Sequence, residues 1–203
     1  MFPQPRYTLL LIRHGQTQAN VEGRFYGRSD SPMTPTGHAQ VQATAERLKD
    51  RPVCHLYSSP AIRAKGTAEI LNKQWKIPLT LDERLWEIDH NRWELMTAAE
   101  IQTTYPTDWA NFIAGGNMDT AHHGGETQAE VAERGCLFLD ELKTRHAGNG
   151  ETIALAAHGG FLQILLCELL GTANRSYWPY RFQNAGVAEV IMYDFGGVLT
   201  SFQ

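Results

Sequence analysis

Apolar residues gather in four short runs that are rich in β-branched and aromatic side chains. These runs predict strands over 7–12, 53–58, 152–157 and 186–193. They are nearly continuous rather than alternating, which is typical of strands buried on both faces of a mainly parallel sheet. The last run is followed by "GGVLTSFQ", which favours an antiparallel hairpin at one edge of the sheet.

Helical patterns lie between the runs and predict helices within 34–50, 59–75, 125–147 and 159–171. Thr34 or Thr36 is the expected cap of the first helix, and Ser59 with Pro60 at the first helical position is the expected start of the second. Gly171 is expected to end the last helix. The alternation predicts an α/β fold: a three-layer α/β/α sandwich whose mainly parallel sheet has an antiparallel edge strand.

The stretch from about 85 to 125 breaks this rhythm. It carries aromatic residues on short helical pieces: Trp86, Trp93, Tyr105, Trp109 and Phe112. We interpret the stretch as a small helical lid inserted over one end of the sheet. The chain shows no internal repeat and no linker rich in Pro, Gly or Ser, so we expect a single domain over 1–203.

Composition narrows the classes of function. Of the 203 residues 42% are hydrophobic, and the formal net charge is -4, so the sequence offers no basic face for nucleic acid or an anionic membrane. Cys54, Cys136 and Cys167 lie far apart and fit neither a disulfide framework nor a zinc site. The first apolar run is too short for a signal peptide, and no run reaches the roughly 20 apolar residues of a membrane span. These features predict a cytoplasmic protein.

Three of the predicted strands end on arginine or histidine side chains. Arg13 and His14 follow the first strand, Arg63 comes in the first helical turn after the second, and His158 follows the third. The carboxyl ends of parallel strands meet at one edge of a sheet, where the next helices present unpaired N–H groups that bind anions. Each residue alone is more often structural than functional. The four together indicate an anion between them.

These residues lie in a series of motifs. The chain reads "RHGQTQAN" at 13–20, "GRFYGRSDSPMTPTGHAQ" at 23–40, "LYSSPAIRAKGTAEIL" at 56–71, "GGET" at 124–127 and "AAHGGFLQILL" at 156–166. In this order they resemble the signatures of the histidine phosphatase superfamily, also called the phosphoglycerate mutase-like family, which opens with R-H-G-[EQ]-[ST]-x-x-N. The resemblance spans nearly the whole chain.

The resemblance implies roles for these residues. His14 would be the nucleophile that takes the phosphoryl group as a phosphohistidine, and Arg13, Arg63 and a charged His158 would hold the phosphate oxygens. Substrate contacts are implied for Asn20, Tyr26, Gly27, Gly159 and Thr127, of which Thr127 equally fits a helix cap. Phosphoryl transfer needs mainly in-line positioning and stabilisation of charge, so neither a metal nor a cofactor is implied.

The family takes the proton for the leaving group from a glutamate in L-x-E-x-x-x-G-x-W-E-G. The stretch "LWEIDHNRWEL" aligns Glu87 as this general acid. Asn91 and Leu95 stand where the family usually has glycines, so we expect the loop that carries Glu87 to follow a different path unless Asn91 accepts positive φ, which asparagine tolerates better than most residues. Asp89 and Glu94 are nearby carboxylates that we expect on the solvated surface.

Three functions are compatible with the sequence. The first is a phosphomonoesterase that releases phosphate from a small phosphorylated metabolite, of sugar phosphate or α-ribazole phosphate type. The second is a cofactor-dependent phosphoglycerate mutase, which is disfavoured because 105–125 contains no Lys or Arg to grip a substrate carboxylate. The third is a catalytically silent phosphate-binding homologue. Trp86, Trp109 and Phe112 either offer stacking surface to a substrate ring or form the core of the lid, and we expect a monomer or a homodimer.

Overall fold

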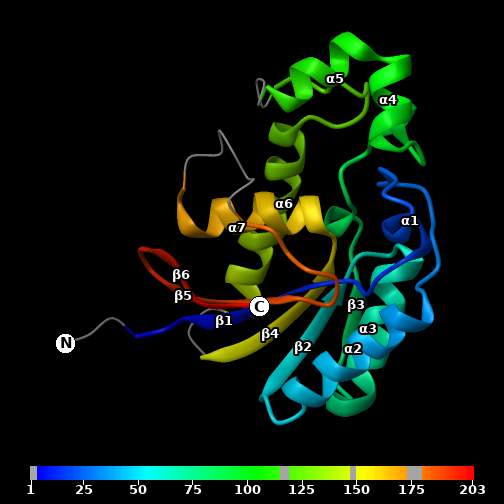
Figure 1. The fold of residues 1–203 in the computed structure, drawn as a ribbon. Helices are drawn as coiled ribbons and strands as arrows, with labels where there is room; N and C mark the ends of the chain where they lie inside the picture. Colours follow the sequence, from blue (N-terminus) through cyan, green and yellow to red (C-terminus); the bar gives the residue numbers. More distant parts are fainter. Residues whose placement is uncertain (1–3, 115–118, 147–149, 173–179) are drawn as a thin grey trace.

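Within the described residues, six strands form one sheet in the order β3-β2-β4-β1-β5-β6 (Figure 1). The computed structural model describes residues 4–114, 119–146, 150–172 and 180–203. The strands are β1 (Tyr7–Arg13), β2 (Val53–Ser58), β3 (Leu79–Leu81), β4 (Glu151–Ala157), β5 (Val187–Tyr193) and β6 (Gly196–Phe202). The helices are α1 (Gln18–Val21), α2 (Pro35–Leu48), α3 (Ile62–Trp75), α4 (Ala98–Thr104), α5 (Pro106–Ile113), α6 (Gln128–His146) and α7 (Gly159–Leu170), with short 3-10 helices η1 (Glu83–Leu85) and η2 (Asn91–Trp93).

β1 lies in the middle of the sheet, between a parallel and an antiparallel neighbour. It pairs parallel with β4, with Arg13 opposite Ala157, and antiparallel with β5. β4 in turn pairs parallel with β2, with Ala156 opposite Ser58. The carboxyl ends of β1, β4 and β2 therefore lie side by side, as the sequence predicts. β5 and β6 form the expected antiparallel edge hairpin.

Helices cover both faces of this sheet. Successive side chains of a strand point to opposite faces. Leu9 and Leu11 of β1 accordingly pack in the cluster that contains residues of α6 and α7. Leu10 and Ile12 pack in the cluster that contains residues of α2 and α3. The helices form one layer on each side of the sheet (Figure 1), so the predicted three-layer α/β/α sandwich is confirmed.

The helix boundaries agree with the sequence in part. Thr34 caps α2 and accepts a hydrogen bond from Gly37 N at 3.0 Å, as expected, and α7 ends at Gly171 in the left-handed conformation, with φ 62°. The predicted start of α3 is wrong, because the helix begins two residues after Pro60 and has no side-chain cap. The strand β3 was not predicted, since three residues are too few for a periodic signal. None of the described helices is long and apolar enough to cross a membrane.

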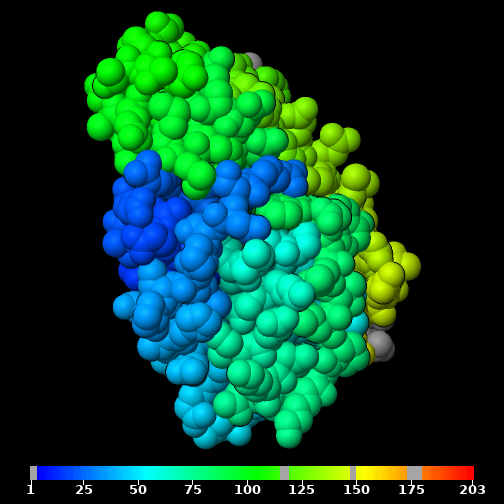
Figure 2. Space-filling view, turned by 90° about the vertical axis from the view of Figure 1, so that its right-hand side faces the viewer, coloured from blue at the N-terminus to red at the C-terminus, as the bar shows by residue number. Residues whose placement is uncertain are grey.

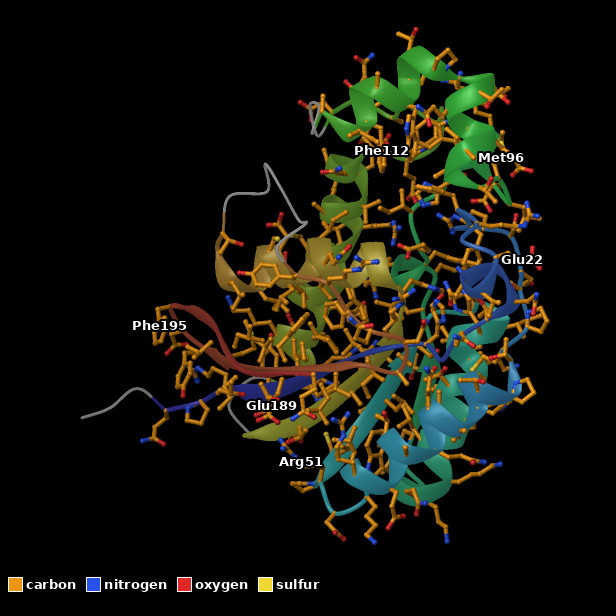
Figure 3. All side chains as sticks on the ribbon, viewed as in Figure 1. Glu22, Arg51, Met96, Phe112, Glu189 and Phe195 are labelled. Atoms are coloured by element: carbon orange, nitrogen blue, oxygen red, sulfur yellow. The ribbon has the colours of Figure 1, made fainter. Side chains whose placement is uncertain are left out.

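The helices α4 and α5 stand apart from the two layers and rest on the loop that follows β1 (Figures 1 and 2). Phe25 N donates to Met96 O at 2.8 Å, which joins this loop to the segment. The rings of Trp93, Trp109 and Phe112 each lie within 6.0 Å of the Phe25 ring, and Phe112 lies on the side of α5 that faces the body of the molecule (Figure 3). Trp109 and Phe112 therefore form the core of this segment. Its action as a lid stays a prediction.

Candidate active site

His14 follows the last residue of β1 and is fixed by both neighbouring strands. Its backbone N–H donates to Ala157 O, and its carbonyl accepts from Ala185 N, both at 3.0 Å. The side chain is 3% exposed, and Nδ1 lies 2.8 Å from Gly15 O. Because a carbonyl can only accept, Nδ1 carries the proton and Nε2 keeps its lone pair. Within the described part of the chain Nε2 makes no hydrogen bond.

The surroundings of His14 favour its neutral form. Burial lowers the pKa of His14 well below its usual value, and the guanidinium groups of Arg13 and Arg63 lower it further. The bond to the Gly15 carbonyl acts in the opposite direction but does not prevail. Neutral imidazole is the form that can attack an electrophile, so this environment suits the nucleophile that the sequence predicts at His14.

Two arginines stand beside His14 and are held by backbone carbonyls. Arg13 donates from Nη1 to Phe182 O at 2.8 Å. Arg63 is 1% exposed and donates to Ser29 O at 3.0 Å and to Gly27 O at 2.8 Å. Burial lowers the pKa of both guanidinium groups. Neither has an ion pair with a carboxylate among the described residues, so their charge is available to a bound anion.

His158 lies opposite His14, at the cap position of α7. The two ring centroids are 5.4 Å apart, and His158 is fully buried. Its Nε2 lies 2.8 Å from Ser59 Oγ, and the Trp86 ring stacks parallel to it at 6.4 Å. Burial, and then the charge of Arg63, lower the pKa of His158 well below its usual value. The charged form expected from the sequence therefore requires an anion beside the ring.

Three buried nitrogen atoms at this edge have no hydrogen-bond partner in the described structure. They are Arg13 Nε, Arg63 Nε and His158 Nδ1. A buried polar group without a partner costs about 1–3 kcal/mol, and more when the group is charged. A tetrahedral oxyanion between His14, Arg13 and Arg63 would satisfy such donors. The geometry at the carboxyl edge therefore suits a bound oxyanion, as the sequence predicts.

Glu87 reaches the same site from the loop after η1, where the sequence places the general acid. It is 8% exposed, and its carboxylate accepts hydrogen bonds from Phe161 N at 2.7 Å and from Gly160 N at 3.0 Å. These N–H groups belong to the first turn of α7, which His158 caps. A Cβ at Gly160 would lie only 2.8 Å from Glu87 Oε1, so a side chain there would push the Glu87 carboxylate from its place.

The loop that carries Glu87 keeps the path that glycines would give it. Asn91 has φ 40° and Leu95 has φ 60°, so both substituted positions take the left-handed conformation. The expectation that Glu94 is solvated is wrong. Its carboxylate is half-buried and accepts from the backbone N–H groups of Gly27, Arg28, Ser29 and His90. Burial acts to raise the pKa of Glu94, but the hydrogen bonds from Ser29 and its neighbours bring it below the usual value.

The other predicted substrate contacts fall into two groups: residues that line the cavity and residues that hold Arg63 in place. Asn20, Tyr26 and Gly159 line the cavity beside Arg13. Gly27 acts instead through its carbonyl, which holds Arg63. The Tyr26 ring lies 4.5 Å from the Arg63 guanidinium carbon, and its hydroxyl is 2.6 Å from Thr17 Oγ1.

Thr127 stands at the start of α6. Its hydroxyl donates to Glu130 and accepts from the backbone N–H of that residue, and the Thr127 carbonyl accepts from Val131 N. This is the geometry of a helix cap. Glu126 precedes the cap, and it forms an ion pair with Arg134 at 2.9 Å.

A cavity of about 500 Å³ opens over these residues. Its lining joins the edge of the sheet to the loop after β1 and to the stretch before β5: Arg13, Asn20, Gly23, Arg24, Phe25, Tyr26, Glu87, His90, Gly159, Gly160, Gln163, Arg181 and Phe182. Trp109 and Phe112 are not among the lining residues. The suggestion that they stack on a substrate therefore loses its structural basis.

Several residues of the site have no distinct signal in the sequence. Ser59 bonds to His158 rather than capping α3, and the Thr67 hydroxyl accepts from Gly15 N at 3.2 Å. The Ser-Pro pair in "YSSP" indicates a turn at Ser59, but it does not indicate that the Ser59 hydroxyl bonds to His158. Gln163 and Arg181 line the cavity, yet each is an isolated polar residue in its segment.

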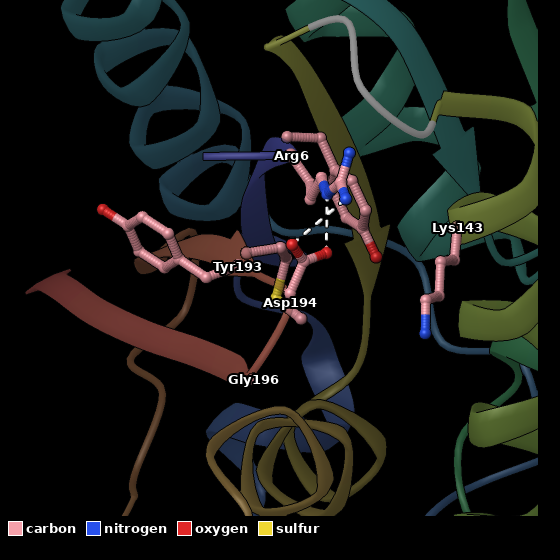
Figure 4. Close-up of a pocket in the computed structure, with 7 residues that line it drawn as sticks. Arg6, Lys143, Tyr193, Asp194 and Gly196 are labelled. Carbon is pink, nitrogen blue, oxygen red and sulfur yellow. Dashed lines mark hydrogen bonds and ion pairs between the residues drawn. The ribbon is translucent and has the colours of Figure 1, made fainter. Parts of the chain in front are cut away.

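A second hollow, of about 280 Å³, lies at the opposite end of the sheet (Figure 4). Its lining includes Arg6, Asp194 and Lys143, and Arg6 donates two hydrogen bonds to Asp194. At the same end, metal-ligating atoms of Cys54, His146 and Glu151 lie within 4.8 Å of one another. Both groupings belong to the amino ends of the strands, so neither serves the phosphate site.

Comparisons with known proteins agree with this geometry. The sequence profile described as "Histidine phosphatase superfamily (branch 1)" matches residues 9–203. The chain is 28% identical to phosphoserine phosphatase 1 of Hydrogenobacter thermophilus over 91% of its length and 86% of the relative. It is 31% identical to a probable phosphoglycerate mutase, GpmB, of Salmonella choleraesuis over 89% of its length and 82% of the relative. The structure of mycobacterial glucosyl-3-phosphoglycerate phosphatase in complex with VO3 matches 96% of this chain and 98% of its own, with 28% identity and a TM-score of 0.87.

Proposed function

The chain belongs to the histidine phosphatase superfamily and is a phosphatase of that type, and we propose that it hydrolyses small phosphomonoesters without a metal, through a phosphohistidine on His14. One observation carries the proposal. A neutral His14 with an available Nε2 lies beside Arg13 and Arg63, which keep buried nitrogen atoms without partners. This set supplies a nucleophile and an oxyanion site in one place.

In the first step His14 Nε2 attacks phosphorus, and the bond from phosphorus to the ester oxygen breaks. The leaving oxygen keeps the electron pair and takes a proton from Glu87, which lies on the first turn of α7 next to His158. Arg13 and Arg63 bind the equatorial oxygens, on which charge is spread in the transition state. The products of this step are the free alcohol and phosphohistidine.

In the second step water attacks phosphorus, and the bond from phosphorus to Nε2 of His14 breaks. The Glu87 carboxylate takes a proton from the water, so its protonation state is restored. Burial, and then the charge of Arg63, lower the pKa of His158, but a phosphate dianion beside Nδ1 favours its protonated form. His158 then adds a charged hydrogen bond to the phosphate.

Hydrolysis of p-nitrophenyl phosphate in EDTA tests this proposal. We expect nitrophenol release that is insensitive to the chelator and absent from His14→Ala. Acid quenching should trap no phosphoenzyme, and base quenching should trap one, because phosphohistidine is labile to acid and stable to base. Activity that needs an added divalent metal, or a phosphoenzyme that persists in His14→Ala, would contradict the proposal.

The same experiment addresses the mutase and the silent homologue. Incubation with 3-phosphoglycerate and a trace of the 2,3-bisphosphate should release phosphate. Isomerisation without phosphate release would instead identify a mutase. Binding of phosphate without any turnover would identify a silent homologue.

We further propose a reducing, cytoplasmic compartment for the protein. This is supported by Cys54, Cys136 and Cys167, which the structure leaves as free thiols. The thermal unfolding temperature of protein purified from its native host should not change when a reductant is added. A fall on reduction would point to an oxidising compartment.

A further inference from the structure

We propose that Arg181, together with Gln163, binds a carboxylate of the substrate, so that the enzyme prefers phosphomonoesters of hydroxy acids to esters of uncharged alcohols. This inference rests on the proposed phosphatase function. It assigns a second anion subsite to the cavity that opens over the phosphate site. Neither residue takes part in the phosphoryl transfer described above.

Arg181 is held at the cavity by its neighbour in the chain. Phe182 is 2% exposed, packs on the Phe202 ring at 5.0 Å, and accepts from Arg13 through its carbonyl. Arg181 is therefore tied to the phosphate site through a fixed backbone position. It lines the cavity. Burial is the main cause of the lowered pKa of Arg13, and the charge of Arg181 is a smaller cause in the same direction.

The charge of Arg181 has no partner in the described part of the chain. It takes part in no hydrogen bond or ion pair there, whereas Arg24, the other arginine on the rim, is already paired. Arg24 bonds to Glu22 at 2.5 Å, to Glu100 at 3.4 Å and to Leu95 O at 2.7 Å. Of these two rim cations, Arg181 is thus the one whose charge is left for a ligand.

Gln163 is a second polar residue that lines the same cavity. It projects from α7 into the cavity and makes no hydrogen bond within the described residues. A guanidinium fork and an amide N–H can together bind the two oxygens of a carboxylate, which is planar like the fork. Phe25 and Tyr26 form apolar wall elsewhere in the cavity. Arg181 is exposed, so an uncharged sugar would leave its guanidinium to solvent instead of pairing it with a ligand.

Two pairs of compounds that differ at one carbon test this subsite. The first pair is 3-phosphoglycerate and glycerol 3-phosphate, and the second is phosphoserine and phosphoethanolamine. We expect the wild-type enzyme to favour the carboxylate in each pair by about 10-fold to 100-fold in kcat/KM. Arg181→Gln should abolish the preference, mainly through a higher KM for the carboxylate substrates.

The controls separate charge from fold. Arg145→Gln removes an exposed arginine of α6 that pairs with Glu141, and it should keep the full preference. Arg181→Lys keeps the charge without the fork and should give an intermediate preference. Equal preferences in the wild type and in Arg181→Gln would overturn the inference while leaving the phosphatase function intact.

Loss of all hydrolysis, p-nitrophenyl phosphate included, would overturn the phosphatase proposal rather than the subsite. The same pairs of compounds would then serve as ligands in thermal unfolding. Greater stabilisation by 3-phosphoglycerate than by glycerol 3-phosphate, lost in Arg181→Gln, would still support the subsite. Equal stabilisation by both would overturn it.

Discussion

The two ends of the sheet carry similar polar side chains, but these differ in whether the protein itself supplies their hydrogen-bond partners. At the amino end Arg6 donates to both oxygens of Asp194, at 2.7 Å and 3.1 Å (Figure 4). His146 lies 2.6 Å from Glu151 on one ring nitrogen and 3.3 Å from the Tyr57 hydroxyl on the other. The protein satisfies these polar groups by itself.

At the carboxyl end the same residue types keep polar atoms without a hydrogen-bond partner in the described structure. Arg63 and His158 are almost fully buried, yet each keeps a nitrogen atom without a partner. The carboxylate of Glu87 bonds to the backbone of α7 instead of neutralising a guanidinium. A charged group thus indicates a ligand when burial and missing partners occur together, and residue type alone does not.

The largest difference between the two ends should appear on truncation of single side chains. We expect His14→Ala to lower kcat/KM for p-nitrophenyl phosphate by at least about 1000-fold, because no second nucleophile forms the covalent intermediate. Arg6→Ala should change it less than about 2-fold, since surface ion pairs contribute little. A comparable loss in both variants would break the contrast between the ends.

Replacement of Glu87 tests whether the carboxylate at the carboxyl end acts as the proton donor. Glu87→Gln keeps the shape of the side chain and should lower kcat for alkyl phosphates by about 100-fold to 10,000-fold. The loss should be much smaller for p-nitrophenyl phosphate, whose leaving group needs no proton. Equal losses for both substrate types, measured under steady-state conditions, would show that Glu87 only supports α7.

The pH profile reports how the arginines act on His14. The neutral imidazole is the reactive form, and its fraction falls only when the pH drops below the pKa of His14. Since burial, Arg13 and Arg63 place that pKa well below 6.5, His14 should cause no fall in kcat/KM near pH 6.5. Arg13→Gln removes one cation, which should raise the pKa of His14 and move the acid limb to higher pH.

The matched comparison of Arg13→Gln with the wild type uses one substrate. Ionisation of the substrate phosphate then affects both profiles equally. An acid limb that does not move in Arg13→Gln would mean that burial alone sets the pKa of His14.

Ser59→Ala tests a positioning residue of the carboxyl end. Loss of the hydroxyl removes the partner of His158 Nε2, and we expect kcat/KM to fall by about 3-fold to 10-fold. Ser59→Thr should restore most of the activity. Ser58→Ala is the matched control, because the Ser58 hydroxyl bonds only to the Ser59 carbonyl. Equal losses in both alanine variants would indicate a general effect on packing.

The smallest expected effect concerns strain in the loop that carries Glu87. Leu95 is 44% exposed and holds φ 60°, a conformation that costs a residue with a Cβ about 1–2 kcal/mol. Leu95→Gly relieves the strain but gains entropy in the unfolded chain, so we expect a stabilisation of up to about 1 kcal/mol in urea unfolding. Leu95→Val should destabilise, because a β-branched residue tolerates positive φ poorly. A destabilised Leu95→Gly would contradict the strain argument.

The sequence predicts the sheet and the phosphate corner because both depend on local signals. The apolar runs identify β1, β2, β4 and β5, and the order of parallel strands brings His14, Arg63 and His158 to one edge. Asn91 and Leu95, at the positions where the family has glycines, both take positive φ. Local sequence signals are therefore enough to predict a site whose residues are brought together by the order and direction of the strands.

The predictions that failed share a different cause: the residue finds its hydrogen-bond partner in a distant segment of the chain. The Ser59 hydroxyl bonds to His158, so α3 starts later than its cap signal indicates. Glu94 has the composition of a surface residue, and only the folded loop places four backbone N–H groups around it. Arg181 precedes β5 without any motif, and its place at the cavity follows from the strand order. Such pairings cannot be read from one segment.

The antiparallel direction of β5 allows the cavity wall to change without a change in the reacting groups. Because β5 runs antiparallel to β1, with Val187 opposite Ile12, the amino end of β5 lies next to the phosphate site. The wall that holds Arg181 can therefore change by insertion or substitution before β5, while the parallel strand ends keep the reacting groups. A protein engineer could graft this entry from one relative to another to exchange the alcohol that is accepted and retain the chemistry.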